Sequence, residues 1–289
     1  MKPEGTEKKF SVLEGLLGSL GSVVVAYSGG VDSTLLVRAA IGALKENGAK
    51  ILAVTARSST YPSSEFDSAV ETAALMGASH RVIVSEELNI PGFSDNPPER
   101  CYFCKGELFG ILSKIARDEG YAAVCDGANM DDLGDYRPGR KAAVELGVRS
   151  PFIEAGMTKD DIRWHAHRLG LANWDKPATA CLASRFPYGS RITAEKLSRV
   201  EKAEALLRGM GFGQLRVRDH DGVARVELAR DQLGLLAGNA GLDEFVSALK
   251  GLGFSFVTLD LEGYRTGSLN ALLSNDQRRI SPEATRRDG

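Results

Sequence analysis

Apolar residues in the first half of the chain fall into short runs that alternate with segments of helical periodicity. The runs suited to buried strands are Val23–Tyr27, Ile51–Thr55, Arg81–Val84 and Tyr121–Cys125, with Phe152–Ile153 as a weaker fifth. The helical patterns lie at about 11–20, 34–47, 65–75 and 104–118. Strands that alternate with helices are typical of a parallel sheet covered on both faces. We therefore expect an α/β domain.

The second half of the chain has a different pattern. Residues 176–192 are rich in Pro, Gly, Ser and Arg and have little periodicity, which favours an active loop and linker. Beyond them we expect a helix at Ala194–Gly209, a hairpin of Leu215–Val217 and Val223–Leu228 about Asp221-Gly222, a helix at Leu242–Leu252 and a strand at Phe254–Leu261. The predicted domains are 1–185, a smaller α+β domain at 186–274, and a disordered tail at 275–289.

The first apolar run opens into a polar, glycine-paired turn. Its residues are Ser28, Gly29, Gly30, Val31, Asp32 and Ser33, directly before a helical pattern. Adjacent glycines let several backbone N–H groups approach an anion, two hydroxyls add donors, and a helix N-terminus favours negative charge. A carboxylate beside phosphate requires a bridging cation, which suggests Mg²⁺ on Asp32. The turn therefore predicts metal-bound nucleotide, and a ligand-free Ser/Gly-rich turn is the alternative.

The type of phosphate loop narrows the chemistry. Neither G-x-x-x-x-G-K-S/T nor G-x-G-x-x-G is found, so neither γ-phosphoryl transfer nor hydride transfer is favoured. The sequence SGGVDS after a strand instead resembles the pyrophosphate loop (PP-loop) of ATP pyrophosphatases, with an adenine nucleotide alpha hydrolase-like fold. These enzymes split ATP into AMP and pyrophosphate by adenylating an oxygen of the substrate. Because ligands bind at the carboxyl ends of parallel strands, we expect Ser28, Thr55 and Asp126 to meet there.

Composition limits the partners and the compartment. The 289 residues carry a net charge of -2, with a pI of about 6.2, which argues against a broad nucleic-acid surface and disfavours tRNA. No apolar run approaches the ~18 residues of a membrane span, and the charged first residues lack an apolar signal core. We expect a cytoplasmic protein. Its four cysteines are too few for a secreted disulfide scaffold.

The cysteines are candidates for metal or redox chemistry. Cys101 and Cys104 form a C-x-x-C pair, which suits zinc, an iron–sulfur cluster or a redox dithiol. Cys181 lies in a comparable loop setting, where Arg185 and Arg191 are placed to stabilise a thiolate. Three cysteines leave one metal position open, which indicates chemistry rather than scaffolding. Cys125 lies in an apolar run; we expect a buried, inert thiol, with a fourth ligand as the alternative.

Two further groups of polar residues suggest binding. The acidic segment 126–139 follows a strand end, where Gly127 is expected beside the nucleotide and Arg137 beside the α-phosphate or the substrate; a solvated acidic turn is the alternative. Arg216 and Arg218 alternate on one strand and so share a face. With Arg265 they suggest a bidentate anion clamp, for which plain surface charge is the alternative. We expect His165 and His167 to be structural.

Five motifs together resemble the LarE family of ATP-dependent sulfur transferases over nearly the whole chain. They are SGGVDS at Ser28, GANMDDLGDYRPG from Gly127, KPATACLASRFPYG from Lys176, RVRDHDGVARVE from Arg216 and LDLEGYRTGSLN from Leu259. The resemblance implies synthesis of the nickel-pincer nucleotide cofactor of lactate racemase-type enzymes. In that synthesis, both carboxylates of pyridinium-3,5-biscarboxylate mononucleotide become thiocarboxylates, each through an acyl-adenylate.

The resemblance also implies how sulfur is supplied. In this family the cysteine matching Cys181 is the sulfur centre, and some members resemble this chain in having a pair matching Cys101 and Cys104. There the three cysteines hold a 4Fe-4S cluster that carries sulfide, whereas members with the single cysteine sacrifice its sulfur and become dehydroalanine. The three cysteines here therefore favour the cluster route.

The remaining expectations concern the substrate and the assembly. Arg216, Arg218 and Arg265 would hold the substrate phosphate, with Glu227 as an acid–base or orienting group. The expected partners are the pyridinium mononucleotide, a sulfide source and further copies of the chain in a homo-oligomer. Two alternatives stay open: a PP-loop 4Fe-4S tRNA thiolase, and a non-catalytic adenine-nucleotide-binding protein with a zinc site.

Overall fold

The computed structural model describes residues 2–44, 50–134 and 137–265, which divide into two compact units. Unit 1 contains the described residues of 2–86 and 101–179. Unit 2 contains residues 87–100 and 180–265. The predicted tail at 275–289 lies outside the described residues. Among the described helices, none is long and apolar enough to cross a membrane.

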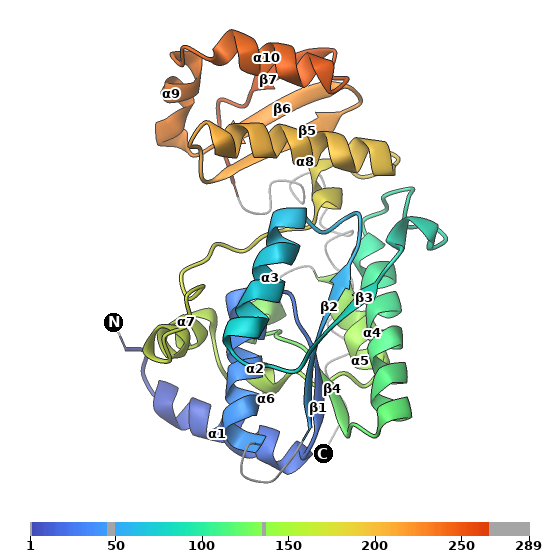
Figure 1. Cartoon of the computed structure of the whole chain (residues 1–289), viewed down its shortest axis with the longest axis vertical. Coiled ribbons are helices and arrows are strands. Elements are labelled where there is room, and N and C mark those ends of the chain that lie inside the picture. The colour runs from blue at the N-terminus through green and yellow to red at the C-terminus, as the bar shows by residue number, and fades with distance from the viewer. Residues whose placement is uncertain (1, 45–49, 135–136, 266–289) are drawn as a thin grey trace. The chain divides into compact units, whose positions relative to one another are not determined.

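Unit 1 is built on a parallel sheet, as the alternating pattern predicted (Figure 1). Its described strands are β1 (Val23–Ala26), β2 (Ile51–Arg57), β3 (His80–Val84) and β4 (Ala123–Cys125), in the order β3-β2-β1-β4. Every neighbouring pair is parallel, and Val24 of β1 is flanked by Leu52 and Val124. The central strand β1 is thereby buried on both faces, which explains its continuous run of valines.

Helices cover both faces of this sheet (Figure 1). They are α1 (Thr6–Leu20), α2 (Val31–Leu44), α3 (Ser63–Leu75), α4 (Arg100–Glu119), α5 (Pro138–Glu145), α6 (Pro151–Glu154) and α7 (Lys159–Arg168), with a 3-10 turn at Met130–Gly134. Val25 packs with residues of α1, α2, α3, α6 and α7, whereas Val24 packs with residues of α4 and α5. Since successive strand residues point to opposite faces, β1 contributes to both cores.

The weaker fifth strand predicted at Phe152–Ile153 is wrong, because these residues lie in the short helix α6. Pro151 occupies the first turn of this helix, where its missing N–H costs no intrahelical bond. Phe152 is fully buried, so its apolar character fits either a strand or a buried helix. The pairing beyond β4 is one isolated bridge between Cys125 and Arg149 in the described chain.

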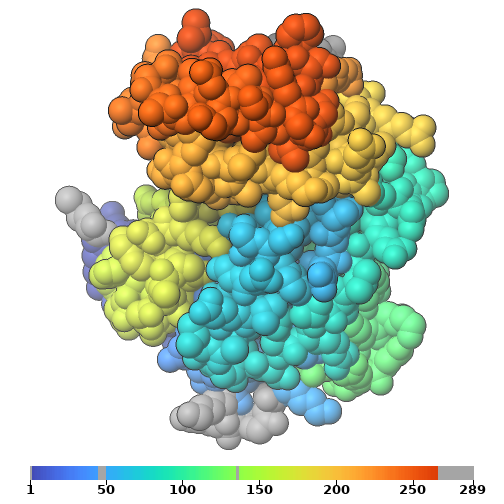
Figure 2. Space-filling model, turned by 45° about the horizontal axis from the view of Figure 1, so that its top comes forward, coloured from blue at the N-terminus to red at the C-terminus, as the bar shows by residue number. Residues whose placement is uncertain are grey.

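Unit 2 contains a mixed sheet and three helices in its described part. They are α8 (Ala194–Gly209), β5 (Leu215–His220), β6 (Val223–Leu228), α9 (Leu233–Ala237), α10 (Leu242–Gly251) and β7 (Phe256–Leu259), with 3-10 turns at Glu87–Asn89, Leu182–Arg185 and Arg230–Gln232. The strand order is β5-β6-β7, antiparallel and then parallel. Figure 2 shows α10 at the surface, where Glu244 and Lys250 are exposed while Phe245 and Leu249 are buried beneath.

The predicted α8 helix and the β5–β6 hairpin are confirmed. Asp221 and Gly222 connect the two strands with φ values of 51° and 93°. Two consecutive positive φ angles suit the tight turn that the right-handed twist of a hairpin favours. The sequence analysis did not predict α9. The predicted domain boundaries and the roles given to the domains stay predictions.

Residues 87–100 belong to unit 2 by their contacts, although the predicted first domain spans 1–185. Buried Asn96, at φ 54°, donates its side-chain amide to the carbonyls of Phe186 (3.3 Å) and Pro187 (2.7 Å). Its own carbonyl accepts from the N–H of Gly189 at 2.9 Å. The turn at Asn96 thus joins two chain segments that are far apart in sequence.

Candidate active site

The predicted phosphate loop lies between β1 and α2, and α2 begins inside the motif at Val31. The Ser33 hydroxyl donates to the Gly30 carbonyl and accepts from the Ser28 N–H, both at 3.2 Å. Gly29 has φ +65°, and a Cβ there would lie 2.6 Å from that of Ala69 on α3. The loop is therefore closed on itself and requires glycine at this position.

Two side chains from other elements hold this loop. Tyr61 donates its hydroxyl to the Ser28 carbonyl at 2.5 Å, and burial raises the pKa of Tyr61. The Asn173 amide donates to the Gly29 carbonyl and the Thr34 hydroxyl, both at 2.9 Å. The first N–H groups of a helix have no intrahelical acceptors, so a loop fixed at the start of α2 suits an anion.

Asp32 lies in the first turn of α2 and is one-quarter exposed, at 25%. One carboxylate oxygen contacts the ammonium of Lys159, and the other accepts from the Asn129 amide at 3.3 Å. A cationic group thus already faces this carboxylate, and oxygen ligands are those that Mg²⁺ prefers. A Cβ on Gly127 would lie 3.1 Å from the Ser33 nitrogen, so glycine permits the close approach of the segment after β4. These residues fit the expected metal-bound nucleotide.

Lys159 was not singled out by the sequence analysis. It is the first residue of α7, behind a capping box formed by Thr158 and Asp161. Its backbone N–H donates to the Asp131 carboxylate at 2.8 Å, and Met130 N–H donates to the Met157 carbonyl at 3.0 Å. The T-x-x-D signature marks the helix start, yet only the fold brings that start to Asp32.

The other predicted nucleotide contacts are arranged as follows. The expectation that Thr55 ends its strand is wrong, because β2 continues to Arg57. The Thr55 side chain is buried, with its hydroxyl 3.0 Å from the Tyr27 carbonyl and 2.8 Å from His80 Nε2. Asp126 does follow β4; burial raises its pKa, although it accepts from the Ser150 hydroxyl at 2.8 Å. Arg137 is exposed and pairs with Asp132 at 2.8 Å. Their roles toward ATP stay predictions.

The C-x-x-C pair lies in the first turn of α4, since this helix begins at Arg100 rather than near Cys104. Residues three apart share a helix face, so both thiols can reach one ligand. Cys101 is exposed and Cys104 is half-buried, and neither forms a disulfide. The pair therefore fits two positions of a metal cluster. Within the described residues, however, no three Cys, His, Asp or Glu side chains gather as a metal-binding group.

Cys181 precedes the 3-10 turn Leu182–Arg185 in unit 2 and is half-buried. Fully buried Arg185 donates to its carbonyl at 3.0 Å and makes a two-pronged pair with Glu204, at 2.8 and 2.9 Å. Burial opposes the charge on Glu204, yet the hydrogen bonds from Arg185 hold its pKa below the usual value. Arg185 thus binds the Cys181 backbone rather than acting as the thiolate partner that the sequence analysis expected.

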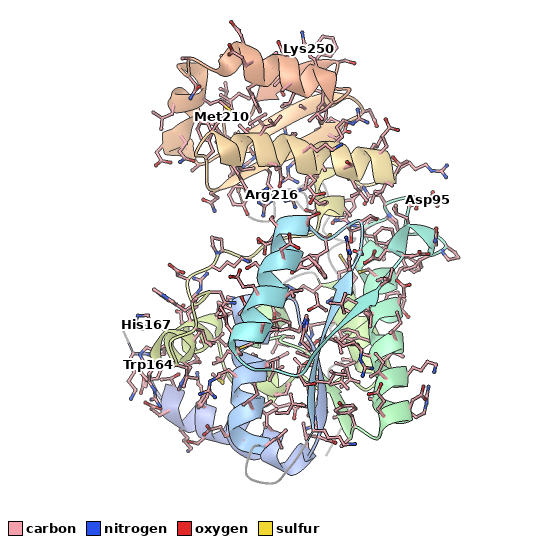
Figure 3. The ribbon with its side chains drawn as sticks, in the orientation of Figure 1. Asp95, Trp164, His167, Met210, Arg216 and Lys250 are labelled. Atoms are coloured by element: carbon pink, nitrogen blue, oxygen red, sulfur yellow. The ribbon has the colours of Figure 1, made fainter. Side chains whose placement is uncertain are left out.

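The predicted anion clamp is partly engaged within unit 2. Arg218 makes a two-pronged pair with buried Glu227, at 2.5 and 3.0 Å, and donates to the Ser184 carbonyl at 2.9 Å. Arg265 pairs with Glu262. Arg216, labelled in Figure 3, is half-buried over the Tyr264 ring, 5.1 Å from its centroid.

Arg216 is the least neutralised of these guanidiniums. Burial lowers the pKa of Arg216, and the charge of Arg185 lowers it further. Among the described side chains, no carboxylate lies within ion-pair distance of its guanidinium. An anionic group of a ligand would relieve this imbalance, and Arg216 therefore fits the expected phosphate contact best.

The two structural expectations for buried residues are met. Cys125 is fully buried, and burial raises the pKa of its thiol to about 12. His165 is also fully buried, with its ring stacked on Phe10 and its Nε2 3.2 Å from the Thr6 carbonyl. Figure 3 shows His167 on the same helix, α7, beside Trp164.

Comparison with known proteins gave close relatives, while no family model matches the chain. An uncharacterised protein of Synechocystis sp. is 44% identical over 268 residues, covering 93% of this chain and 99% of that protein. The pyridinium-3,5-bisthiocarboxylic acid mononucleotide synthase of Lactiplantibacillus plantarum is 40% identical over 270 residues, covering 93% and 96%. A probable tRNA sulfurtransferase of Methanothermobacter thermautotrophicus is 26% identical over 164 residues, covering 53% and 41%.

Proposed function

This chain belongs to the LarE family of pyridinium-3,5-bisthiocarboxylic acid mononucleotide synthases, and from that premise we propose that it thiolates pyridinium-3,5-biscarboxylate mononucleotide at the expense of ATP. It is an enzyme, and sulfur transfer is its chemistry. The observation that carries the proposal is the identity of 40% over nearly the full length of both chains. The closed phosphate loop with Asp32 beside it supports ATP as the second substrate.

The first proposed step activates the substrate. A carboxylate is a poor electrophile because its leaving group would be oxide, so one carboxylate oxygen attacks the α-phosphorus of ATP. The bond from that phosphorus to the bridging oxygen breaks, and pyrophosphate leaves with the electron pair. The N–H groups at the start of α2 and the hydroxyls of Ser28 and Ser33 would hold the departing charge. Asp32 would hold Mg²⁺, which supplies further positive charge at the phosphates.

The second proposed step delivers sulfur. A sulfur nucleophile adds to the acyl carbon, the bond to the AMP oxygen breaks, and AMP leaves, so that a thiocarboxylate remains. Cys101, Cys104 and Cys181 would together hold the sulfur source. A 4Fe-4S cluster on these three thiolates would present sulfide at the iron that lacks a cysteine. Two rounds, one for each carboxylate, consume two ATP.

Substrate binding is assigned to unit 2. Arg216 would contact the phosphate of the mononucleotide, with Arg265 beside it in sequence to Tyr264. Since Arg218 is tied to Glu227 and to the Ser184 carbonyl, we assign these two residues to fixing the turn after Cys181. The cytoplasmic location, the homo-oligomer and an external sulfide source stay predictions.

Metal analysis of protein purified without oxygen tests the sulfur source. About four irons and four or more acid-labile sulfides per chain are expected, and Cys101→Ala, Cys104→Ala or Cys181→Ala would lose them. Cys125→Ala is the matched control, because its buried thiol lies among apolar side chains. Iron-free protein that thiolates its substrate once and loses about 32 Da, one sulfur atom, would instead show that Cys181 is consumed.

A further inference from the structure

Lys159 makes a contact at the phosphate loop that neither proposed step uses. Its ammonium lies on one oxygen of the Asp32 carboxylate, the atom pair to which the metal was assigned above. The Asn129 amide lies on the other oxygen at 3.3 Å. Donors from two later segments of the chain therefore converge on a single carboxylate of α2.

The position of Lys159 is built by its surroundings. The Asp131 carboxylate accepts from its backbone N–H at 2.8 Å, and the Thr158 hydroxyl accepts from the Asp161 N–H within the capping box. Asp161 is fully buried and accepts from the ammonium of Lys9 at 2.6 Å. The first turn of α7 is thereby fixed, and Lys159 approaches Asp32 from a rigid helix start.

The environment of the pair differs from that of an ordinary surface ion pair. Lys159 and Asp32 keep 26% and 25% of their side-chain exposure, beside the helix N-terminus that suits an anion. A metal ion and an ammonium carry charge of the same sign, so they compete for the same carboxylate oxygen. A lysine has three donors on a flexible four-carbon stem, which lets it move from a carboxylate to a nearby phosphate.

We propose that Lys159 is a further catalytic residue of adenylation, which neutralises Asp32 in the nucleotide-free protein and moves to the triphosphate when metal-bound ATP enters. This inference rests on the proposed function. On the triphosphate, the ammonium contacts phosphate oxygens and stabilises the charge that grows on the leaving pyrophosphate. In the empty site, the same ammonium keeps the metal from binding before the nucleotide.

The test measures metal affinity without nucleotide, using Mn²⁺ as a paramagnetic probe followed by electron paramagnetic resonance. Lys159→Met removes the competing charge, so Mn²⁺ should bind the nucleotide-free protein about 10-fold more tightly. Lys114→Met is the matched control, because it removes a lysine from an exposed pair with Asp118 on α4. This control should leave the affinity for Mn²⁺ unchanged.

Pyrophosphate release gives a second readout. At saturating ATP and substrate, Lys159→Met should lower kcat by about 100-fold with a smaller change in KM, because the lost contact is strongest in the transition state. Lys159→Arg keeps the charge and should recover part of the rate. Lys159→Gln repeats the test should the Met variant fail to fold.

Folded Lys159→Met or Lys159→Gln protein with wild-type affinity for Mn²⁺ and wild-type pyrophosphate release would overturn the inference. The proposed function fails separately: wild-type protein would then bind no ATP in calorimetry and release no pyrophosphate with the pyridinium substrate. Wild-type turnover with unchanged lysine variants would leave the proposed function standing and remove only the role of Lys159.

Discussion

At the scale of single residues, Asp32 is where the helix start, the Lys159 ammonium and the expected metal meet. Asp32→Asn keeps the size of the side chain but removes the charge that would hold Mg²⁺. We expect pyrophosphate release to fall at least about 100-fold, measured by a coupled pyrophosphate assay. Asp118→Asn, a surface change on α4, should keep the rate. Normal release by Asp32→Asn would show that the metal lies elsewhere.

Cys181 allows the two proposed steps to be separated. Cys181→Ala should abolish thiocarboxylate formation, followed by mass spectrometry, because the sulfur source is lost. Adenylation needs no thiol, so pyrophosphate release should stay within about 3-fold of wild type. Thiolated product from Cys181→Ala would remove the role assigned to this residue.

His165 makes stability depend on pH. Burial lowers the pKa of His165, and its Nδ1 has no hydrogen-bond partner among the described residues. The unfolded chain, with a histidine pKa near 6.5, therefore binds the proton more readily than the folded protein. The stabilisation is complete above about pH 6.5 and declines as the pH falls through that value.

We expect chemical unfolding to show a free energy that falls between about pH 7 and pH 5.5. His165→Gln should flatten this dependence, because the titrating group is gone. Glu7, Asp161 and Arg168 act on the same ring and remain in the variant. An identical slope in both proteins would contradict the assignment.

The sequence was sufficient to predict the loop residues and not the lysine. Ser28, Gly29 and Ser33 lie next to one another in the chain, so local patterns reveal them. Lys159 and Asn173 reach the same loop from more than 120 residues away. No local pattern encodes such a distance, and only the packing of α7 against α2 creates the contact.

At the scale of elements, the turn from β1 to α2 depends on one close approach. Gly29→Ala would place a methyl group 2.6 Å from Ala69 Cβ at a positive φ. We expect the free energy of unfolding to fall by roughly 1–3 kcal/mol and ATP affinity to fall as the loop shifts from α3. At Gly30 the added Cβ would meet its nearest atom at an ordinary 3.5 Å, so Gly30→Ala should keep the stability. Equal stability of both variants would contradict this account.

Elements were predicted well where periodicity was long and poorly where it was short. α8 spans four turns and its bounds agree with prediction. Phe152–Ile153 offers two residues, which is too few to distinguish a strand from the helix α6. The start of α4 was missed because Arg100 and Cys101 carry no strong cap signal, although they place the C-x-x-C pair on one helix face.

At the scale of the whole molecule, charge separates this chain from the tRNA alternative. The match to the probable tRNA sulfurtransferase covers 41% of that protein, and the net charge here is -2. Nonspecific tRNA binding depends on many Lys and Arg contacts with phosphates. Filter binding at about 0.15 M salt should therefore detect no complex at micromolar protein. Micromolar binding with a steep salt dependence would revive the alternative.

The composition of unit 2 from residues 87–100 and 180–265 has a consequence for biosynthesis. A ribosome that adds about 5–20 residues per second needs roughly 4 to 16 seconds to make residues 101–179. During that time Asn96 has been translated, but the carbonyls of Phe186 and Pro187 that it binds do not yet exist. A nascent chain stalled in this interval would hold the first segment of unit 2 without its partner, and a fragment that starts after residue 100 would lack it altogether.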